Sequence, residues 1–332
     1  MGSAPQTNSF AGRGRMTTAV RQFDVTLAGE FNLDLLLYGL PEELPVEREL
    51  LADRAEMVLG GSPAITAHNL AALGNRVGFI SLAAKDAFAA LCMRELEMAG
   101  VDLSRTLHVA DGTGTGLTVL LQHEHVRRML TYPGTTTKLC FDDLDLEYLM
   151  SSQHFHLSSY FLQTSLKEDV TRLFSFLKEA GLTISLDTND DPNESWDLST
   201  DVLRHTDLLL PNEQEACRLA HAANLDDAIE WILQFVPLVV VKRGAEGAIA
   251  CTREHRYVAP ARKLPVIDAV GAGDSFNAGL LHGYVRGWPI ERCLRYGNLA
   301  GAYSTTAIGG VAAFQDRKAM QEFLAEHSLQ VK

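Results

Sequence analysis

Short apolar runs alternate with helix-like segments along most of this chain, and no other feature constrains the fold as strongly. The apolar runs have the length and composition of strands that are buried on both faces of a sheet. Apolar residues at helical spacing fill the intervals between them. Strands that alternate with helices predict an α/β protein, with a mainly parallel sheet and helices on both faces. The predicted strands are 23–29, 77–83, 154–159, 182–187, 207–212 and 238–243, and the predicted helices are 62–74, 86–99, 165–180, 212–221, 225–235, 273–287 and 289–306.

Two regions interrupt this alternation. Residues 34–60 include the proline-punctuated stretch LPEELPVE, and residues 108–132 combine β character with glycine-rich turns. Neither region fits a strand–helix unit, so we expect about 34–60 and 108–135 to form a small β-sheet. Such a sheet would suit a lid that excludes water from a site at the carboxyl edge of the main sheet. The alternative is a set of surface loops and a hairpin with no role.

The start of the chain differs in composition from the rest. Residues 1–20 are polar, small and rich in Gly and Arg, and they lack the apolar core of a signal peptide. We predict a flexible N-terminal tail over 1–20 and a single domain over 21–332. With 332 residues, 46% of them hydrophobic, the chain is long enough to bury a sizeable core.

The charge and the cysteines narrow the range of partners and compartments. The 42 acidic and 29 basic side chains give a net charge of −13. This balance disfavours nucleic acid as a partner, because phosphate backbones require patches of Lys and Arg. No apolar run reaches the roughly 20 residues that span a bilayer, so no membrane partner is expected. Five scattered cysteines without C-x-x-C spacing disfavour a disulfide framework or a zinc site, and predict a cytoplasmic protein.

A glycine-rich turn precedes one predicted helix. In DAVGAGDSFNAG (268–279), Gly271, Ala272 and Gly273 stand where a loop becomes a helix. The first N–H groups of a helix have no helical partners and the dipole favours negative charge, so the turn predicts an anion hole for a phosphoryl group. Asp274 would repel a bound phosphate, which indicates a general base that takes the proton of an attacking hydroxyl. The alternative is a simple helix cap, and the turn alone does not separate the two.

Further motifs give this turn a context. DAVGAGDSFNAG resembles the C-terminal signature of the ribokinase-like (PfkB-type) carbohydrate kinase family, and GGSPAITAHNLAALG (60–74) resembles its N-terminal signature. GEFNLD (29–34), PNEQEA (211–216) and VVVKRGAEG (239–247) look like further landmarks of that family, over about 22–315. The resemblance implies a ribokinase-like fold, Rossmann-like in its three layers, with a small β lid. It also implies an ATP-dependent kinase that phosphorylates a hydroxyl of a small polyhydroxylated substrate.

The resemblance also implies roles for individual residues at the matching positions. Asp274 would be the catalytic base, and the anion hole would be lined by Gly271, Ala272 and Gly273. The ATP side would use Asn212, Lys242, Gly244, Gly247 and Asn298. Mg²⁺ bound with ATP would be held, largely through water, by Asn212 and Glu215. A monovalent cation such as K⁺ would be organised by Asp268. The acceptor substrate would lie against Asn32, Asp34, Gly60, Gly61, Ser158 and Asp274.

Some positions can be weighed physically, and two depart from the family pattern. Asn32 and Asp34 alternate on one face of a strand end, where an amide and a carboxylate can bracket sugar hydroxyls. Ile65 stands where the family commonly has an Asn that binds substrate, and an Ile cannot make that hydrogen bond. Val270 replaces a usual Thr beside the implied cation site, so a requirement for K⁺ stays open.

Three functions fit the sequence. The first is a kinase for a sugar or a sugar acid. The second is a nucleoside kinase of the same family, because Phe31, Tyr132 and Phe161 could stack a base. The third is a non-catalytic regulator that binds a sugar or nucleotide on the same scaffold. In each case a lid with an apolar face and unpaired edges predicts a homodimer through the small sheet.

Overall fold

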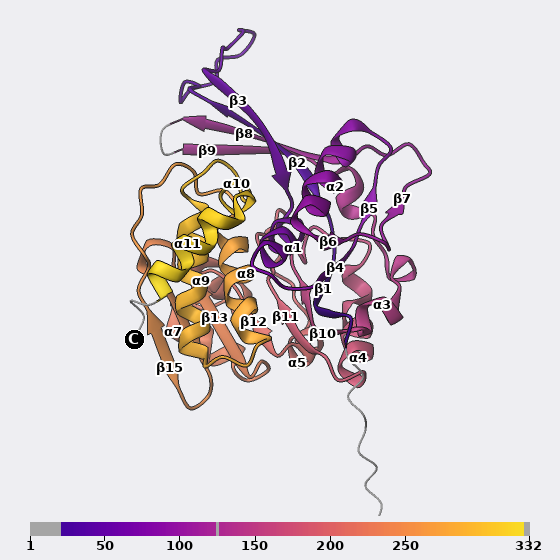
Figure 1. Cartoon of the computed structure of the whole chain (residues 1–332), viewed down its shortest axis with the longest axis vertical. Helices are drawn as coiled ribbons and strands as arrows, with labels where there is room; N and C mark the ends of the chain where they lie inside the picture. Colours follow the sequence, from indigo (N-terminus) through magenta and orange to yellow (C-terminus); the bar gives the residue numbers. More distant parts are fainter. Residues whose placement is uncertain (1–20, 124–125, 329–332) are drawn as a thin grey trace, which may run out of the picture.

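A nine-stranded sheet forms the centre of the molecule in the computed structural model, which describes residues 21–123 and 126–328 (Figure 1). Strands β13 through β6 of this sheet run parallel, and β14 and β15 pair antiparallel at one end. The predicted mainly parallel sheet is thereby confirmed. In order across the sheet the strands are β15 (Arg256–Ala259), β14 (Ala248–Cys251), β13 (Leu238–Lys242), β12 (Leu208–Leu209), β11 (Thr183–Leu186), β10 (Ser152–Leu157), β1 (Phe23–Ala28), β4 (Val77–Ile80) and β6 (Val101–Asp102).

Two layers of helices cover the two faces of this sheet, as the alternating sequence predicts. In β13, Val239 and Val241 enter one core and Val240 enters the other, because successive side chains point to opposite faces. The first face packs against α3 (Leu146–Met150), α4 (Val170–Glu179), α5 (Thr200–His205), α6 (Glu213–Leu219) and α7 (Leu225–Ile232). The second face packs against α1 (Ser62–Ala72), α2 (Ala87–Ala99), α8 (Ala272–Tyr284) and α9 (Ile290–Ser304). The outer side of α9 contacts α10 (Ala312–Gln315) and α11 (Arg317–Ser328).

Short segments of 3₁₀-helix occur in the connections. They are η1 (Gly134–Thr137), η2 (Phe141–Asp143), η3 (Lys167–Asp169) and η4 (Gly244–Glu246). The last of these follows β13 directly. No helix within the described ranges is both long enough and apolar enough to cross a membrane.

A separate small sheet projects from the body of the molecule, at the top of Figure 1. Its strand order is β3 (Arg54–Gly60), β2 (Asn32–Tyr38), β8 (Gly116–His123) and β9 (Val126–Tyr132), with only β2 and β8 parallel. Strand β2 begins at Asn32, slightly before residue 34, where the first region was predicted to start. At the predicted start of the second region, β7 (Leu107–His108) pairs with β5 (Leu82–Ala83) and not with this sheet. The predicted tail, 1–20, lies outside the described residues.

The two faces of the small sheet differ in chemistry. On the inner face, Leu36 and Leu120 pack with Val270, which follows the main sheet's last strand in the chain. The opposite, outer face carries a cross-strand row of apolar side chains, set by the register of the four strands. This row consists of Met57, Leu35, Val119 and Leu130.

Candidate active site

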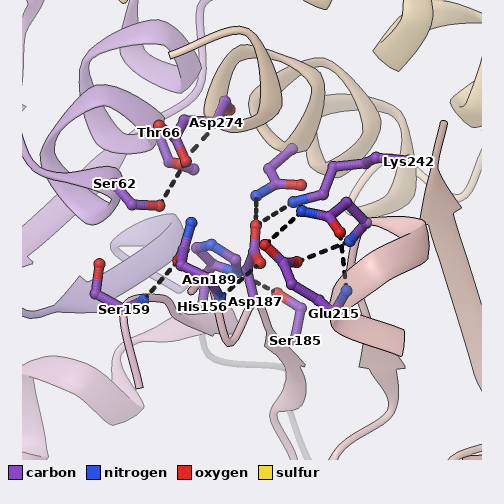
Figure 2. Close-up of polar contacts among 12 residues, drawn as sticks. Ser62, Thr66, His156, Ser159, Ser185, Asp187, Asn189, Glu215, Lys242 and Asp274 are labelled. Carbon is purple, nitrogen blue, oxygen red and sulfur yellow. Dashed lines mark hydrogen bonds and ion pairs between the residues drawn. The ribbon is translucent and has the colours of Figure 1, made fainter. Parts of the chain in front are cut away.

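Polar side chains gather where the carboxyl ends of β10 and β11 face the first turns of α1 and α8 (Figure 2). Parallel α/β sheets bind their ligands at this edge, since the loops there can diverge around a crevice. The close-up shows Asp274 of α8 beside Ser62 of α1, above a group formed by Asp187, Asn189 and Lys242. The site therefore draws on segments that lie far apart in the sequence.

The glycine-rich turn has the backbone that an anion hole requires. Gly271 precedes α8 with φ 70°, in the left-handed region that favours glycine. A methyl group added there would come within 2.5 Å of the Gly310 Cα, so close backbone approach also requires glycine. No side chain caps α8 within the described part of the chain, so its first N–H groups are not taken by a capping group. The Asp274 carboxylate is thus not the helix cap.

Asp274 lies in the first turn of α8 and is held by its neighbours. Ser62 donates a hydrogen bond to Oδ1 of Asp274 over 2.5 Å. Burial raises the pKa of Asp274 to about 7, and the nearby Asp187 charge acts in the same direction, while Ser62, Lys242 and Asn189 oppose the shift. A carboxyl group with this pKa is a competent proton acceptor near neutral pH.

Lys242 is paired with a carboxylate that the sequence interpretation did not identify. Its ammonium group contacts Asp187, which is fully buried and also accepts a hydrogen bond from Asn277 Nδ2 over 2.6 Å. Burial lowers the pKa of Lys242, but the Asp187, Glu215 and Asp274 carboxylates more than offset this and raise it. Lys242 therefore stays charged beside the glycine turn.

Asn212 and Glu215 form a capping box at the start of α6. Glu215 accepts from the Asn212 backbone N–H over 2.8 Å and from Nδ2 over 2.6 Å, while Asn212 Oδ1 accepts from the Glu215 N–H. Burial raises the pKa of Glu215, and the Asp187 charge adds to the shift. The buried carboxyl groups of Asp187 and Glu215 both interact electrostatically with Lys242, and carboxyl oxygens of this kind suit a hydrated Mg²⁺.

A cavity of about 560 Å³ opens on the other side of the glycine turn. Its size falls within the range of small-molecule sites, and its lining is largely apolar with a few polar groups. The cavity is lined by Ala272 and Gly273 of the turn and by four of the five residues that the resemblance implies for ATP binding. Those four are Lys242, Gly244, Gly247 and Asn298, and Asn212 is not part of the lining. Asn298 uses its Nδ2 to hold the backbone carbonyl of Ala259, at the end of β15.

The residues implied for the acceptor lie mostly on the inner face of the small sheet and its junction with α1. Asn32 accepts a hydrogen bond from Thr136 on Oδ1, over 2.8 Å. Asp34 is only 8% exposed, and no donor among the described residues hydrogen-bonds to its carboxyl group. Gly60 pairs with Asn32 across the sheet, and Gly61 precedes α1. Ser158 is fully buried, and its hydroxyl has no partner in the described structure.

The carboxyl groups of Asp34 and Glu30 are both affected by burial and by the Asp274 charge. Burial raises the pKa of Asp34 to about 7, and the Asp274 and Asp268 charges add to this. Burial likewise raises the pKa of Glu30 to about 7, although a hydrogen bond from Ser159 opposes it. The Glu30 side chain is 4% exposed and its Oε2 has no partner within the described ranges. Hydroxyl donors of a bound substrate would satisfy groups of this kind.

The residue implied for a monovalent cation ties two loops together. Asp268 accepts from the Val270 N–H over 3.1 Å and from the Gly309 N–H over 2.9 Å. The Ile65 side chain packs beneath the same region, because a methyl group added to Gly310 would meet it at 2.8 Å. Both departures from the family pattern, Ile65 and Val270, thus serve apolar packing next to the turn.

The aromatic residues that suggested a nucleoside acceptor do not lie where a base could stack. Phe31 is fully buried in the core beneath α1 and α2. Phe161 is buried against Tyr160 and Trp196. Tyr132 pairs with Leu117, on the face of the small sheet opposite to Asp34.

Several residues of this site escaped the sequence interpretation. Four of them contact or influence residues that it did identify, and these are Ser62, Glu30, Asp187 and Asn189. The fifth, Asn277, donates a hydrogen bond to Asp187. A signal existed for two of them, because Asp187 ends the predicted buried strand 182–187 and Asn189 follows it closely, as Asn32 and Asp34 follow the predicted strand 23–29. Such polar residues at the carboxyl ends of parallel strands are expected at a ligand crevice.

Comparisons with known proteins show which proteins this chain is similar to. An ATP-dependent ribose-1-phosphate kinase of Halopiger xanaduensis is 29% identical over 306 residues, covering 91% of this chain and 98% of its own. A 2-dehydro-3-deoxygluconokinase of Bacillus subtilis is 26% identical over 280 residues, 80% of this chain and 86% of its own. The solved structure of a putative ribokinase II from E. coli superposes with a TM-score of 0.81 for its apo form and 0.79 for its complex with ATP and Mg²⁺. It is 24% identical, with 92% of this chain and 99% of that chain covered.

Fold and site together define a carbohydrate kinase with the ribokinase-like fold, a phosphotransferase that acts on an alcohol group. The description pfkB family carbohydrate kinase matches residues 23–317, and the chain belongs to that family.

Proposed function

We propose that this chain transfers the γ-phosphoryl group of ATP to a hydroxyl of a sugar or sugar acid, with Asp274 as the general base. The observation that carries the proposal is the position of Asp274 between a cavity and a group of buried carboxyls. On one side the glycine turn borders the largely apolar cavity with Lys242 and Asn298. On the other side are the carboxyl groups of Glu30 and Asp34, which act electrostatically on Asp274. The named activities of the two relatives, on a sugar phosphate and a sugar acid, support a substrate of this class.

The proposed reaction is a single transfer of the γ-phosphoryl group from ATP to the acceptor hydroxyl. Asp274 accepts the proton of the acceptor hydroxyl while the hydroxyl oxygen forms a bond to the γ-phosphorus. The bond between that phosphorus and its bridging oxygen breaks, and the oxygen leaves on ADP with the electron pair. The N–H groups of the turn formed by Gly271, Ala272 and Gly273, which no side chain of the described residues caps, would stabilise the charge on the transferring group.

The remaining residues have binding roles in this proposal. Lys242, Gly244, Gly247 and Asn298 would hold ATP, with the adenine in the apolar part of the cavity. Asn212 and Glu215 would hold Mg²⁺ through its water shell, next to the buried Asp187. Mg²⁺ when bound would neutralise phosphate charge. Asn32, Asp34, Gly60, Gly61 and Ser158 would form the acceptor side, and Asp268 with the carbonyls near it is the candidate for a K⁺ site.

The small sheet is proposed as the lid of this site and as the interface of a homodimer. Its inner face carries Asn32, Asp34 and the hydrogen-bonded pair Thr118 and Thr131, which suits a polyhydroxylated substrate. Its outer face exposes large apolar side chains, which soluble monomers seldom leave in one patch. We further propose a cytoplasmic location, since the five cysteines are all unpaired.

The test is an ATP-consumption screen with Mg²⁺ across pentoses, hexoses, ketoses, sugar acids, sugar phosphates and nucleosides. Wild type is compared with Asp274→Asn and with Asp197→Asn, which changes an exposed carboxyl outside the site. We expect one acceptor class to react, with the rate reduced about 10²- to 10⁴-fold by Asp274→Asn alone. Undiminished activity of Asp274→Asn would contradict the base assignment. Binding of ATP or a sugar without turnover across the whole panel would favour the regulator instead.

A further inference from the structure

Two non-glycine residues with left-handed backbone stand side by side at the carboxyl edge of the main sheet. Ser159 (φ 55°) follows β10, and Asn189 (φ 52°) follows the neighbouring strand β11. Backbone of this kind is strained for residues other than glycine and persists only where the surroundings hold it, which is most often at functional sites. The strain at these two adjacent positions therefore calls for a local role.

One hydrogen bond orients the Asn189 side chain, and a second holds its backbone. Its Oδ1 accepts a hydrogen bond from the Ser159 N–H over 2.8 Å, and its own N–H donates to Asp187 Oδ1 over 3.2 Å. With Oδ1 used as the acceptor, the other end of the amide must be Nδ2, which can only donate. Figure 2 shows this nitrogen pointing toward Asp274 and Ser62.

The groups that face Asp274 from the other elements are mostly acidic. Lys242 of β13 and Ser62 of α1 favour its ionised form. Asp187, at the end of β11, disfavours it, and so do Glu30 and Asp34 through their mutual electrostatic interaction with Asp274. Asn189 adds a neutral donor on the side where Asp187 already stands, and like Ser62 it lowers the pKa of Asp274.

We propose that Asn189 is a positioning residue for phosphoryl transfer, which directs its Nδ2 at the Asp274 carboxylate and is itself locked by the Ser159 backbone. It does not touch the reacting atoms. It acts by keeping the base ionised and aimed at the acceptor hydroxyl, among neighbouring carboxylates that would otherwise favour the protonated form. This inference rests on the proposed role of Asp274 and adds a residue that the motifs of the family resemblance did not include.

The matched pair of variants is Asn189→Asp and Asn224→Asp. At position 189 the change keeps the shape and the acceptor for Ser159, but it replaces the donor that faces Asp274 with a carboxylate oxygen. Asn224, at the start of α7, makes the same kind of contacts far from the site, because it accepts from the Asp227 N–H and donates to Asp227 Oδ2. A third variant, Asn189→Gly, removes the amide and accommodates the left-handed backbone without strain.

The first measurement does not depend on activity. Protein labelled with ¹³C at the Asp carboxyl carbons is titrated, and the Asp274 signal is assigned by its loss in Asp274→Asn. We expect the Asp274 titration to move upward by about one pH unit in Asn189→Asp, because a like charge replaces a donor. Asn189→Gly should produce a smaller upward shift, and Asn224→Asp none. An unchanged Asp274 titration in a folded Asn189→Asp or Asn189→Gly protein would overturn the proposal.

The second measurement uses the acceptor that the kinase screen identifies. In Asn189→Asp the acid limb of kcat/KM should move with the Asp274 titration, so that kcat below pH 7 falls about tenfold while the KM for ATP stays within about twofold. A merely structural role would lower stability or raise both KM values without moving the limb. If Asp274→Asn itself kept full activity, the proposed function would fail first, whereas the ¹³C titration would still decide the role of Asn189.

Discussion

Asp34 and Gly60 show how single residues shape the acceptor side of this kinase. A methyl group added to Gly60 would lie 2.2 Å from Asp34 Oδ1, so glycine makes room for the carboxyl group. That group is buried and no described residue hydrogen-bonds to it, an arrangement that costs stability whenever the carboxyl is ionised. Such a cost is typical of binding groups whose polar atoms are paired only when the ligand is bound.

Replacing Asp34 with a neutral residue should therefore lower the activity and raise the stability of the fold. The folded pKa of Asp34 is about 7, above its unfolded value of about 3.9, so the ionised group destabilises the fold increasingly as pH rises. Asp34→Asn should raise the free energy of unfolding at pH 8, by up to about 4 kcal/mol at 1.36 kcal/mol per unit, and leave it nearly unchanged below pH 4. Urea unfolding at both pH values checks this. A gain of equal size at both would show that the charge is not the cause.

The pH dependence of turnover belongs to the same scale. The pKa of Asp274 is about 7, and a general base must be ionised to accept a proton. We expect kcat/KM to fall about tenfold per pH unit below pH 7 and to level off above it. Because Glu30 and Asp34 titrate in the same range, the measured value belongs to the group of carboxyls rather than to Asp274 alone. A fall in kcat/KM that begins only near pH 4 would contradict the raised pKa of the buried base.

Sequence patterns identified the residues of this site that belong to short motifs. Lys242, Asn298 and the two glycines after β13 line one cavity together with Ala272 and Gly273, as the family resemblance implied. Glu30 and Ser62 flank the predicted motifs, and nothing in their spacing indicated that one is a buried acid and the other a partner of Asp274. Those facts depend on how α1 packs against α8, which no local pattern encodes.

At the scale of elements, the contact between the small sheet and the glycine turn deserves a test. Leu36 of β2 and Leu120 of β8 meet Val270 in a small apolar cluster separate from the two main cores. Only a few side chains hold the inner face of the sheet against the body. The small sheet should therefore open more readily than the main sheet, as a lid must.

Truncating this cluster should loosen the small sheet alone. Leu120→Ala is expected to increase hydrogen exchange in β8 and β9, with exchange in β10 unchanged, and to raise the KM of the acceptor more than that of ATP. Leu121→Ala is the matched control, since its side chain points to the outer face of the same strand. Equal effects of the two variants, or increased exchange across the main sheet, would mean that the cluster does not govern the lid.

The sequence predicted the long buried strands and the long amphipathic helices, but it missed several of the short and edge elements. The runs around β1, β10, β11 and β13 are apolar enough to be read locally. The predicted strand 207–212 contains the two-residue strand β12, whereas the two-residue strand β6 was not predicted and is too short to show a periodic pattern. Strands β14 and β15 are the antiparallel edge, and their identity as strands follows from pairing with β13 rather than from their own composition.

At the scale of the whole molecule, the outer face of the small sheet exposes a row of apolar side chains. Met57 and Leu130 are 58% and 61% exposed, and they occupy one cross-strand row with Leu35 and Val119. An apolar sheet face of this kind is stabilised when a second copy covers it. The order of strands that creates the row is a long-range property, and the sequence alone did not specify it.

A charge on this face should separate the proposed dimer. Leu130→Glu is expected to convert a dimer into a monomer by light scattering at micromolar concentration, because burying an unpaired carboxylate opposes association. Val258→Glu places the same charge on the exposed β15 at the other end of the molecule and should leave the mass unchanged. A wild-type monomer under these conditions would contradict the dimer directly.

Ile65 has a consequence for how this kinase could change over evolutionary time. Its side chain is 3% exposed and packs against Gly271 and Gly310. The apolar side chain that cannot hydrogen-bond a substrate therefore also supports the backbone of the turn. Ile65→Asn would restore the residue common in the family, yet it would leave a void beside the turn and place an amide among apolar neighbours. A substitution at Ile65 would therefore change the acceptor preference and the packing of the turn at the same time. A lineage that left this state would need a second, compensating substitution, so the order in which mutations arise would decide which acceptors remain within reach.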